Sequence, residues 1–267
     1  MINTKSRGFK IYKIISLILS VLFWLGVWAL LAYRVNIEFL LPSPKAAISA
    51  LISLARTAEF WQISGESLLR ILAGIVVAVV LGTLFAVFTA KINTLDSLFS
   101  PLMTVIKATP IASFIILALL WIDRNTLPVF ITVLIVLPVV WSNVSAGIRS
   151  VDRGLLDVAK IYRFSFGKKI IKIYLPSVMP YFLAACQSAL GMAWKAGIAA
   201  EVLCIPERAI GTQMYFSKTY LQTTELFAWT LAVIIFSVII EKLLIFGLKK
   251  LVQRLHVARG EVSDANA

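Results

Sequence analysis

Histidines, cysteines and carboxylates within apolar segments, the groups that could form a catalytic or metal site here, are few in this sequence. The single histidine, His256, lies in a basic tail, so neither a Ser-His-Asp triad nor a histidine-based metal site can be assembled. Cys186 and Cys204 fall at opposite ends of one apolar segment, roughly 27 Å apart along a helix, which excludes a disulfide between them. Glu201 and Glu241 are the only carboxylates inside apolar segments, too few for a converging catalytic set. The sequence therefore indicates neither an enzyme nor a metal site.

Cations inside apolar segments point instead to the movement of a solute. A charge at membrane depth is costly and is expected to face the bundle interior or a wet cavity. In Lys107-Ala108-Thr109-Pro110, the proline also removes a backbone hydrogen bond and is expected to kink its helix. For Lys107 the alternative is a purely structural pairing, and for Arg70 it is a pairing with Glu66, four residues earlier. The candidate translocation path comprises Arg70, Lys107, Thr109, Pro110, Trp194, Lys195 and Glu201.

The longest polar interruption between the apolar segments is the stretch 152–180. It holds six cations against two acids, yet its apolar residues recur at helical spacing. Asp152 is a candidate cap for a first short helix, and Ser165 to Gly167 is a candidate turn before a second. Each half is too short and too charged to span a bilayer. The stretch is therefore predicted to be a helix-turn-helix at the membrane surface, with an apolar face that requires a partner.

Composition places the whole chain in a membrane. Its 267 residues are 60% hydrophobic and have a mean hydropathy of +0.92, which is typical of an integral membrane protein. The net charge of +13 lies outside the apolar segments and lacks the aromatic interleaving of a single-strand platform, so nucleic-acid binding is not expected. No Gly-x-x-x-x-Gly-Lys-Ser/Thr sequence occurs. We therefore expect no cofactor on this chain, and ATP, if it drives the protein, must bind to a partner subunit.

We predict an all-α polytopic membrane protein with about six transmembrane helices. Gly74 and Gly82 in the second span would allow close helix packing. The predicted organisation is a cytoplasmic N-terminal segment 1–13, a transmembrane domain 14–248 that includes the loop 152–180, and a cytoplasmic tail 249–267. The predicted spans lie near residues 14–33, 66–90, 98–121, 127–147, 181–203 and 226–248.

The distribution of lysine and arginine predicts the orientation. Sixteen of the 26 fall in the segments proposed to be cytoplasmic, against six in the external ones. Because cations concentrate in short cytoplasmic loops, both termini and the stretch 152–180 are assigned to the cytoplasm. No small-residue cleavage site follows the basic segment 1–13, which favours a retained anchor over a signal peptide.

One pattern in the stretch 152–180 resembles a known motif. Asp157-Val158-Ala159, three residues, Arg163, nine residues and Ile173-x-Leu175-Pro176 follow one another. This resembles the EAA loop of ABC importer permeases, which has the same spacing but Glu in place of the Asp and Gly in place of the Arg. The resemblance assigns ATPase coupling to Asp157, Val158, Ala159, Tyr162, Arg163, Gly167, Ile173, Leu175 and Pro176.

Arg163 is the departure with a structural consequence. A Gly at such a position often has a backbone geometry that other residues adopt at a cost. Gly167, four residues later, is a candidate to supply the turn instead. On that interpretation, Arg163→Gly should be nearly silent.

Over nearly its full length the chain resembles the permeases of binding-protein-dependent ABC importers of the nitrate, taurine and aliphatic-sulfonate type. The features that carry this resemblance are Leu41-Pro42-Ser43-Pro44, Ser67-Leu68-x-Arg70 with Gly74, Pro101, the segment from Lys107 to Trp121, Asn143 with Gly147, Trp194 and Ala200-Glu201. The resemblance implies a type I importer permease fold in the plasma (inner) membrane of a prokaryote.

The same resemblance implies the partners and the mechanism. Two permease copies, expected to form a homodimer, would make the pore within the membrane lipid. Two ABC ATPase subunits would dock on the cytoplasmic loops, and an extracytoplasmic substrate-binding protein would deliver a small nitrogen or sulfur compound. Arg70, Lys107 and Lys195 would suit an anion if they line the path, whereas Glu201 would oppose it or neutralise one of them.

The competing interpretation is a secondary transporter or channel that works without ATP. Such a protein would not need a long cytoplasmic helix-turn-helix, and it often shows internal repeats, which are not evident in this sequence. The neighbouring genes distinguish the two interpretations, since an importer permease is expected beside an ATPase and a secreted binding protein.

Overall fold

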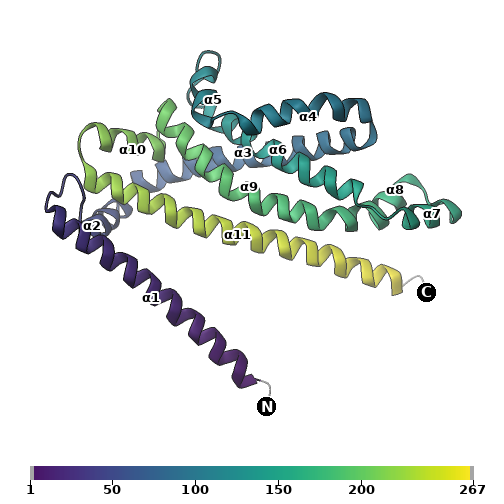
Figure 1. Ribbon diagram of the computed structural model, residues 1–267, viewed down its shortest axis with the longest axis horizontal. Coiled ribbons are helices and arrows are strands. Elements are labelled where there is room, and N and C mark those ends of the chain that lie inside the picture. The colour runs from purple at the N-terminus through teal and green to yellow at the C-terminus, as the bar shows by residue number, and fades with distance from the viewer. Residues whose placement is uncertain (1–2, 265–267) are drawn as a thin grey trace. The chain divides into compact units, whose positions relative to one another are not determined.

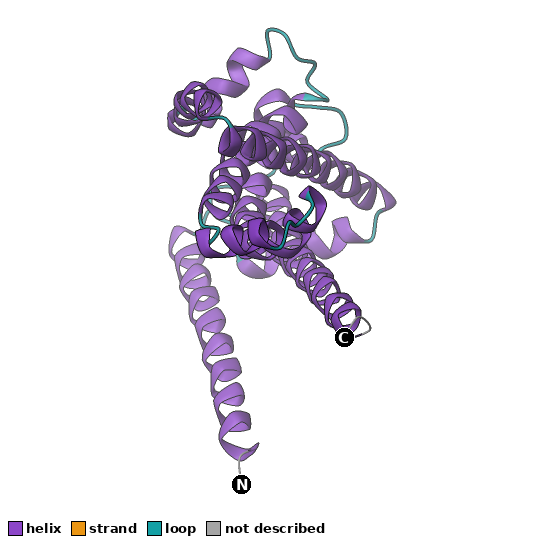
Figure 2. Ribbon diagram, turned by 90° about the vertical axis from the view of Figure 1, so that its right-hand side faces the viewer, coloured by secondary structure: helices purple, strands orange, loops and turns teal. Residues whose placement is uncertain are grey.

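The computed structural model describes residues 3–264, which are helical and contain no strand (Figures 1 and 2). Within them, five helices are long and apolar enough to cross a membrane, or six if one bent pair counts as a span. This agrees with the predicted number. The five are α1 (Asn3–Val35), α3 (Ala58–Lys91), α6 (Leu127–Arg149), the continuous helical run Phe166–Cys204, and the Thr223–Gly247 part of α11 (Thr223–Asp264).

The chain divides into two compact units. The first unit comprises Met1–Trp61 and Gln213–Val233, and the second comprises Gln62–Thr212 and Ile234–Ala267. In the first unit, Trp28 donates its indole N–H to the carbonyl of Pro42 at 3.1 Å and stacks on Phe227 with ring centroids 5.6 Å apart. The short helix α2 (Pro44–Ala55) begins where Ser43 accepts a hydrogen bond from the N–H of Ala46, and Pro44 occupies the first turn.

The core of the second unit lies between α6, α9 (Leu175–Cys204) and α5 (Ile111–Ala118). Figure 1 shows α6 and α9 running along each other, and a cluster of buried apolar residues packs between them and α5. The buried cluster consists of Ile115, Ala118, Leu127, Ile131, Ala196, Ala200 and Cys204. Small residues on α9 let its backbone approach α6 closely.

Two glycines of α3 lie directly against α6, as the sequence predicted. A Cβ added at Gly74 would come within 2.6 Å of the Thr132 Cβ, and one added at Gly82 within 2.9 Å of the Val140 Cβ. Because the two glycines are eight residues apart, they lie on one face of α3. Their missing side chains therefore determine how closely these two helices pack.

The third predicted span is broken rather than kinked. α4 (Asn93–Ala108) ends before Thr109, and α5 begins after Pro110, with an angle of 101° between the two helices. Pro110 has no N–H to continue the helix, and the residue before a proline avoids the α conformation. Thr109 accordingly has extended backbone angles (φ −79°, ψ 132°). The predicted disturbance at Pro110 is present, but it is a break between two helices and not a kink within one, because the chain bends by 101° at this point.

The second half of the stretch 152–180 is also not a separate helix. α8 (Phe166–Lys169), a π-helical turn (Ile170–Tyr174) and α9 form one continuous run, whereas the sequence suggested a short helix that stops before a fifth span near Tyr181. In the π turn, Leu175 donates its N–H to Ile170, five residues back. A wider turn leaves room for the ring of Pro176, which would clash with the carbonyl four residues before it in an α-helix. The helical run therefore accommodates Pro176 and continues through it.

The turn before α8 is made by Arg163 and not by Gly167. Arg163 has φ +48°, in the left-handed region, and its N–H bonds to the carbonyl of Lys160. Gly167 lies inside α8, and no glycine among the described residues has a positive φ. The expectation that Gly167 takes over the turn is therefore wrong. Arg163 itself adopts the conformation that Gly adopts at lower cost.

The predicted terminal segments continue the first and last spans as helices. α1 begins at Asn3, inside the segment 1–13, and α11 continues to Asp264, inside the tail 249–267. The ends of both predicted segments, residues 1–2 and 265–267, lie outside the described residues. The boundaries of the transmembrane domain at 14 and 248 stay predictions.

Arg163→Gly is expected to stabilise the loop rather than be silent. Removing the side chain from a left-handed position should relieve about 1 kcal/mol. Hydrogen exchange of the loop amides in the detergent-solubilised protein should then slow by about fivefold. Gly167→Ala is the matched variant, since nothing lies within 4 Å of its added Cβ and Gly167 is helical. This variant should leave hydrogen exchange of the loop amides unchanged or slow it. Faster exchange would instead show that Gly167 makes the turn.

Candidate functional site

The residues of the predicted coupling loop build a small core of their own. Val151, Ala159 and Ile173 are buried together, and Leu156, Phe164 and Tyr174 pack against them. Ala159 is completely buried, so it faces this core and not solvent. The loop is therefore a folded substructure whose two halves hold each other, as its helical spacing predicted.

Two caps begin its helices. Asp152 accepts a hydrogen bond from the N–H of Gly154 at 2.8 Å at the start of α7 (Arg153–Ile161), which confirms its predicted role. Ser165 accepts one from the N–H of Lys168 at 3.4 Å at the start of α8. These bonds satisfy backbone donors that have no partner inside the helix.

The outer face of the loop carries large apolar side chains that are about half exposed or more. Val158 is half exposed, Tyr162 is 73% exposed, and Asp157 lies beside them with Lys160 at 3.4 Å. We call this surface the loop face, and it consists of Leu155, Val158, Ile161, Tyr162 and Phe166. An apolar patch of this kind on a loop outside the spans is typical of a protein interaction site. Of the other predicted loop residues, Leu175 is exposed and Pro176 is half-buried in the first turn of α9.

The predicted path residues Arg70 and Glu201 meet each other, far from the loop in sequence. The Glu201 carboxylate is completely buried, and the Arg70 guanidinium lies 3.6 Å from its Oε1. Its other oxygen, Oε2, accepts hydrogen bonds from the Ser67 hydroxyl at 2.9 Å and the Gly211 N–H at 3.2 Å. Arg70 also pairs with Glu66 at 3.1 Å, the structural alternative that the sequence suggested. Glu201 thus neutralises one of the three span cations.

The same cluster holds the segment that follows α9. Arg70 donates to the carbonyls of Glu207 at 2.7 Å and Arg208 at 3.2 Å, and the Ile210 N–H donates to the Ser67 hydroxyl at 2.9 Å. Arg208 has φ +45°, and Ile205, which ends α9, has φ +50°. A β-branched residue in that region is strained, and such strain persists only where the surroundings enforce it.

Glycine is required at one point of this cluster. A Cβ on Gly211 would lie 2.5 Å from both the Glu201 Cβ and the backbone nitrogen of Val202. The close approach brings the Gly211 N–H onto the buried carboxylate. Ser67 and Gly211 were not assigned to a site from the sequence, because their partners lie more than a hundred residues away or across a turn.

Lys107 and Lys195 have no such compensation. Lys107, in the last turn of α4, reaches the Ser142 hydroxyl of α6 at 3.4 Å. Lys195 is exposed on α9. Within the part of the chain that the structure describes, neither lysine forms an ion pair. Thr109 and Pro110 form the break that follows Lys107, at the end of α4.

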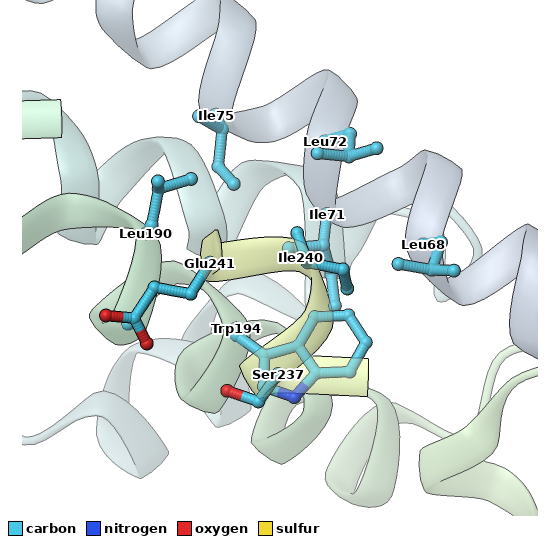
Figure 3. Close-up of a pocket in the computed structure, with 10 residues that line it drawn as sticks. Leu68, Ile71, Leu72, Ile75, Leu190, Trp194, Ser237, Ile240 and Glu241 are labelled. Atoms are coloured by element: carbon cyan, nitrogen blue, oxygen red, sulfur yellow. The ribbon is translucent and has the colours of Figure 1, made fainter. Parts of the chain in front are cut away.

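Trp194, the remaining path candidate, lies in a narrow apolar crevice between α3, α9 and α11 (Figure 3). The crevice measures about 10 Å³, room for at most one water, so it is a packing defect and not a solute site. Its lining comprises Leu68, Ile71, Leu72, Ile75, Leu190, Gly191, Trp194, Ser237, Ile240 and Glu241. The structure thus brings Arg70 and Glu201 together and places Lys107 beside the break at 109–110. Trp194 belongs to neither group. The role of all seven residues in a path stays a prediction.

Glu201→Ala should destabilise the protein strongly, because it leaves Arg70 without its buried partner and two donors unsatisfied. Breaking a buried pair costs about 3 kcal/mol or more, which should lower the Tm by about 5–10 °C. Glu66→Ala is the matched control, since Glu66 is a partly exposed partner of the same arginine, and its loss should cost less than about 1 kcal/mol. Equal Tm values for the two variants, measured by thermal unfolding in detergent, would contradict the structural role of the cluster.

The chain is similar to known transport proteins. Residues 74–257 match the protein family described as binding-protein-dependent transport system inner membrane component. The bicarbonate transport system permease protein CmpB of Synechococcus elongatus is 28% identical over 147 residues, which are 54% of this chain and 52% of that protein. The chain thus spans about half the length of this relative. The taurine transport system permease protein TauC of Escherichia coli is 24% identical over 242 residues, 88% of this chain and 86% of that one.

The fold has a counterpart among solved structures. One chain of a bacterial alginate ABC transporter, crystallised with a periplasmic protein carrying an alginate pentasaccharide, superposes with a TM-score of 0.57 at 14% identity and covers 94% of this chain and 96% of that one. The chain therefore belongs to the family of binding-protein-dependent transport system inner membrane components, and it has the type I ABC importer permease fold.

Proposed function

We propose that this chain is the permease subunit of an ABC importer, which forms the translocation pathway for a small solute while ATP is hydrolysed on a separate subunit. The observation that carries the proposal is the loop face, an exposed apolar surface on a loop that has its own buried core. A folded, capped loop with an uncovered apolar surface is suited to dock in a groove of another protein. Family membership supports an ATPase as that protein.

The proposed assembly contains two permease copies, two ATPase subunits and an extracytoplasmic binding protein. The alginate transporter with the same fold was crystallised with a periplasmic protein, which supports the binding protein as a partner. The excess of cations in the loop 152–180 and in both terminal segments supports a cytoplasmic location for all three. Docking of α7 would then take place on the side where ATP is available.

For the substrate, the contacts of the three span cations favour an anion held by two of them. Arg70 is neutralised by Glu66 and Glu201, whereas Lys107 and Lys195 keep an uncompensated charge on helices that cross the membrane. Such charges are expected to face a wet cavity. The named substrates of two relatives, bicarbonate and taurine, carry an anionic group. We propose a small anionic nitrogen, sulfur or carbon compound, with nitrate and sulfonates in the same class.

Docking on the loop face is tested by Tyr162→Glu. A charge in the centre of an apolar interface should abolish co-purification of the ATPase when the permease is co-expressed with its gene neighbours, while the permease still inserts in the membrane. Tyr220→Glu is the matched control, because this tyrosine is 68% exposed but belongs to the connection between α10 (Ile210–Thr219) and α11 and not to the loop 152–180. It should retain the ATPase.

Two outcomes would contradict the proposed function. Co-purification of the ATPase with the Tyr162→Glu variant would show that the loop face is not the docking surface. A permease that purifies alone and moves solute in liposomes without ATP would establish the alternative, a secondary transporter or channel. Ala159 is not a suitable probe of docking, because a bulky residue there would disrupt the loop core.

The anion site is tested by Lys195→Gln in liposomes that contain the complete importer. Loss of a charged hydrogen-bond donor should reduce uptake by about tenfold or more, with the ATPase still bound, and Lys195→Arg should restore part of the rate. Lys218→Gln, an exposed lysine on α10, serves as the control and should transport normally. Unchanged uptake by Lys195→Gln would remove this residue from the path.

A further inference from the structure

We infer that Asp96 and Arg149 form a charge link that couples the ATPase-docking loop to the broken span α4–α5, and that they are positioning residues for transport. The inference rests on the proposed function, because it assigns a role within the same importer. Neither residue belongs to the predicted coupling loop or to the predicted path.

The link joins the ends of two helices. An Arg149 guanidinium nitrogen lies 2.6 Å from a carboxylate oxygen of Asp96, a short charge-assisted contact. Asp96 is in the first turn of α4, and Arg149 is in the last turn of α6. Each charge also interacts favourably with the dipole of its own helix, so the pair is held from both sides.

Arg149 stands at the base of the coupling loop. Two residues later, Val151 is buried in the loop core against Ala159 and Ile173. The segment between them is short and is fastened at Ser150, whose N–H bonds to Ala146 and whose hydroxyl donates to Gly147. A displacement of the loop core must therefore move Arg149 with it.

Asp96 stands at the far end of the helix that leads to the break. Within α4, Asp96 and Lys107 are roughly 16 Å apart along the axis at the rise of an α-helix. Its other end touches α6 again, where Lys107 donates to Ser142 at 3.4 Å. α4 is thus attached to α6 by a charged contact near each end, and the 101° turn at Thr109 and Pro110 follows immediately.

Through these contacts, a movement of the loop can be transmitted to the membrane-embedded helices by a second route, besides the backbone of α6. α6 continues the loop through its own backbone, whereas α4 is separated from the loop by more than forty residues of chain. Through Asp96, a movement of Arg149 is passed to α4 and hence to the break that holds Lys107. The ion pair thereby couples the position of the break to the movement of the ATPase that binds the loop.

A merely structural role predicts a different result. Asp96 and Arg149 are 27% and 54% exposed, and exposed ion pairs contribute little to stability. Removing the pair should therefore leave the Tm nearly unchanged. Loss of transport without loss of stability is the signature that separates coupling from folding.

The experiment uses the complete importer in liposomes and measures solute uptake and ATP hydrolysis in the same samples. Asp96→Arg and Arg149→Asp should each retain the ATPase subunit on purification and hydrolyse ATP, but uptake per ATP should fall about fivefold or more. The double variant Asp96→Arg/Arg149→Asp, which restores opposite charges, should recover at least half of the loss. Lys91→Asp, an exposed cation five residues before Asp96, is the control for the change in charge and should stay coupled.

Each outcome decides a separate question. Failure of the wild-type permease to bind an ATPase would refute the proposed function and the link with it. Normal uptake per ATP in both single variants, with the ATPase bound, would refute the link alone. A double variant no better than the single ones, or a fall in Tm equal in all three, would show that the charges act on folding and not on coupling.

Discussion

A fully buried carboxylate in a membrane protein requires a counter-charge and hydrogen bonds, and Glu201 obtains them from the Arg70 guanidinium beside Oε1 and from two donors to Oε2. Its partners come from α3 and from the segment after α9, so a single acidic group determines how three parts of the second unit meet. The close approaches depend on the same arrangement. Gly197 of α9 would place an added Cβ 2.6 Å from Ile71 of α3, one turn along from the Arg70 and Ser67 contacts. Charge pairing and close backbone packing therefore reinforce each other at this end of the helices.

The loop 152–180 is stabilised by a different physical means. It has no buried charge, and its core is a small cluster of apolar side chains supported by two caps. Its tightest turn contains an arginine in a left-handed conformation, which is unfavourable for a residue with a side chain. The neighbouring Ala159 and Phe164 hold the turn through the bond from the Phe164 N–H to the Ala159 carbonyl. The loop is thus ordered enough to present its exposed apolar residues in a fixed arrangement.

Much of this organisation was predictable from the sequence. Apolar runs of about twenty residues identify the spans, and Asp152, Gly74 and Gly82 have local signals with a single physical meaning. The break at Pro110 was located correctly, but its angle depends on what α4 and α5 pack against, which no local pattern records. The sequence predicts that Pro176 interrupts the helix before the next span, whereas a π turn accommodates it.

The candidate site was harder to predict than the fold. The sequence identified Arg70 and Glu201 as charges that need explanation, but they are 131 positions apart and nothing local pairs them. The same is true of Asp96 and Arg149. Long-range ion pairs follow from tertiary packing, and a single sequence contains no direct signal for them. Gly167 is the natural candidate for a left-handed position because glycine adopts it at lower cost, and only the backbone shows that Arg163 occupies that position.

The continuous helical run from Phe166 to Cys204 has a mechanical consequence. Its 39 residues form a rod about 58 Å long, which begins inside the coupling loop and ends at the buried carboxylate cluster. A rigid rod that tilts by about 10° around its midpoint moves each end by roughly 5 Å in opposite directions. A small push at one end would therefore pull on the strained segment at the other, where Ile205 and Arg208 are held in place. The two ends of this helical run would therefore move together and in opposite directions.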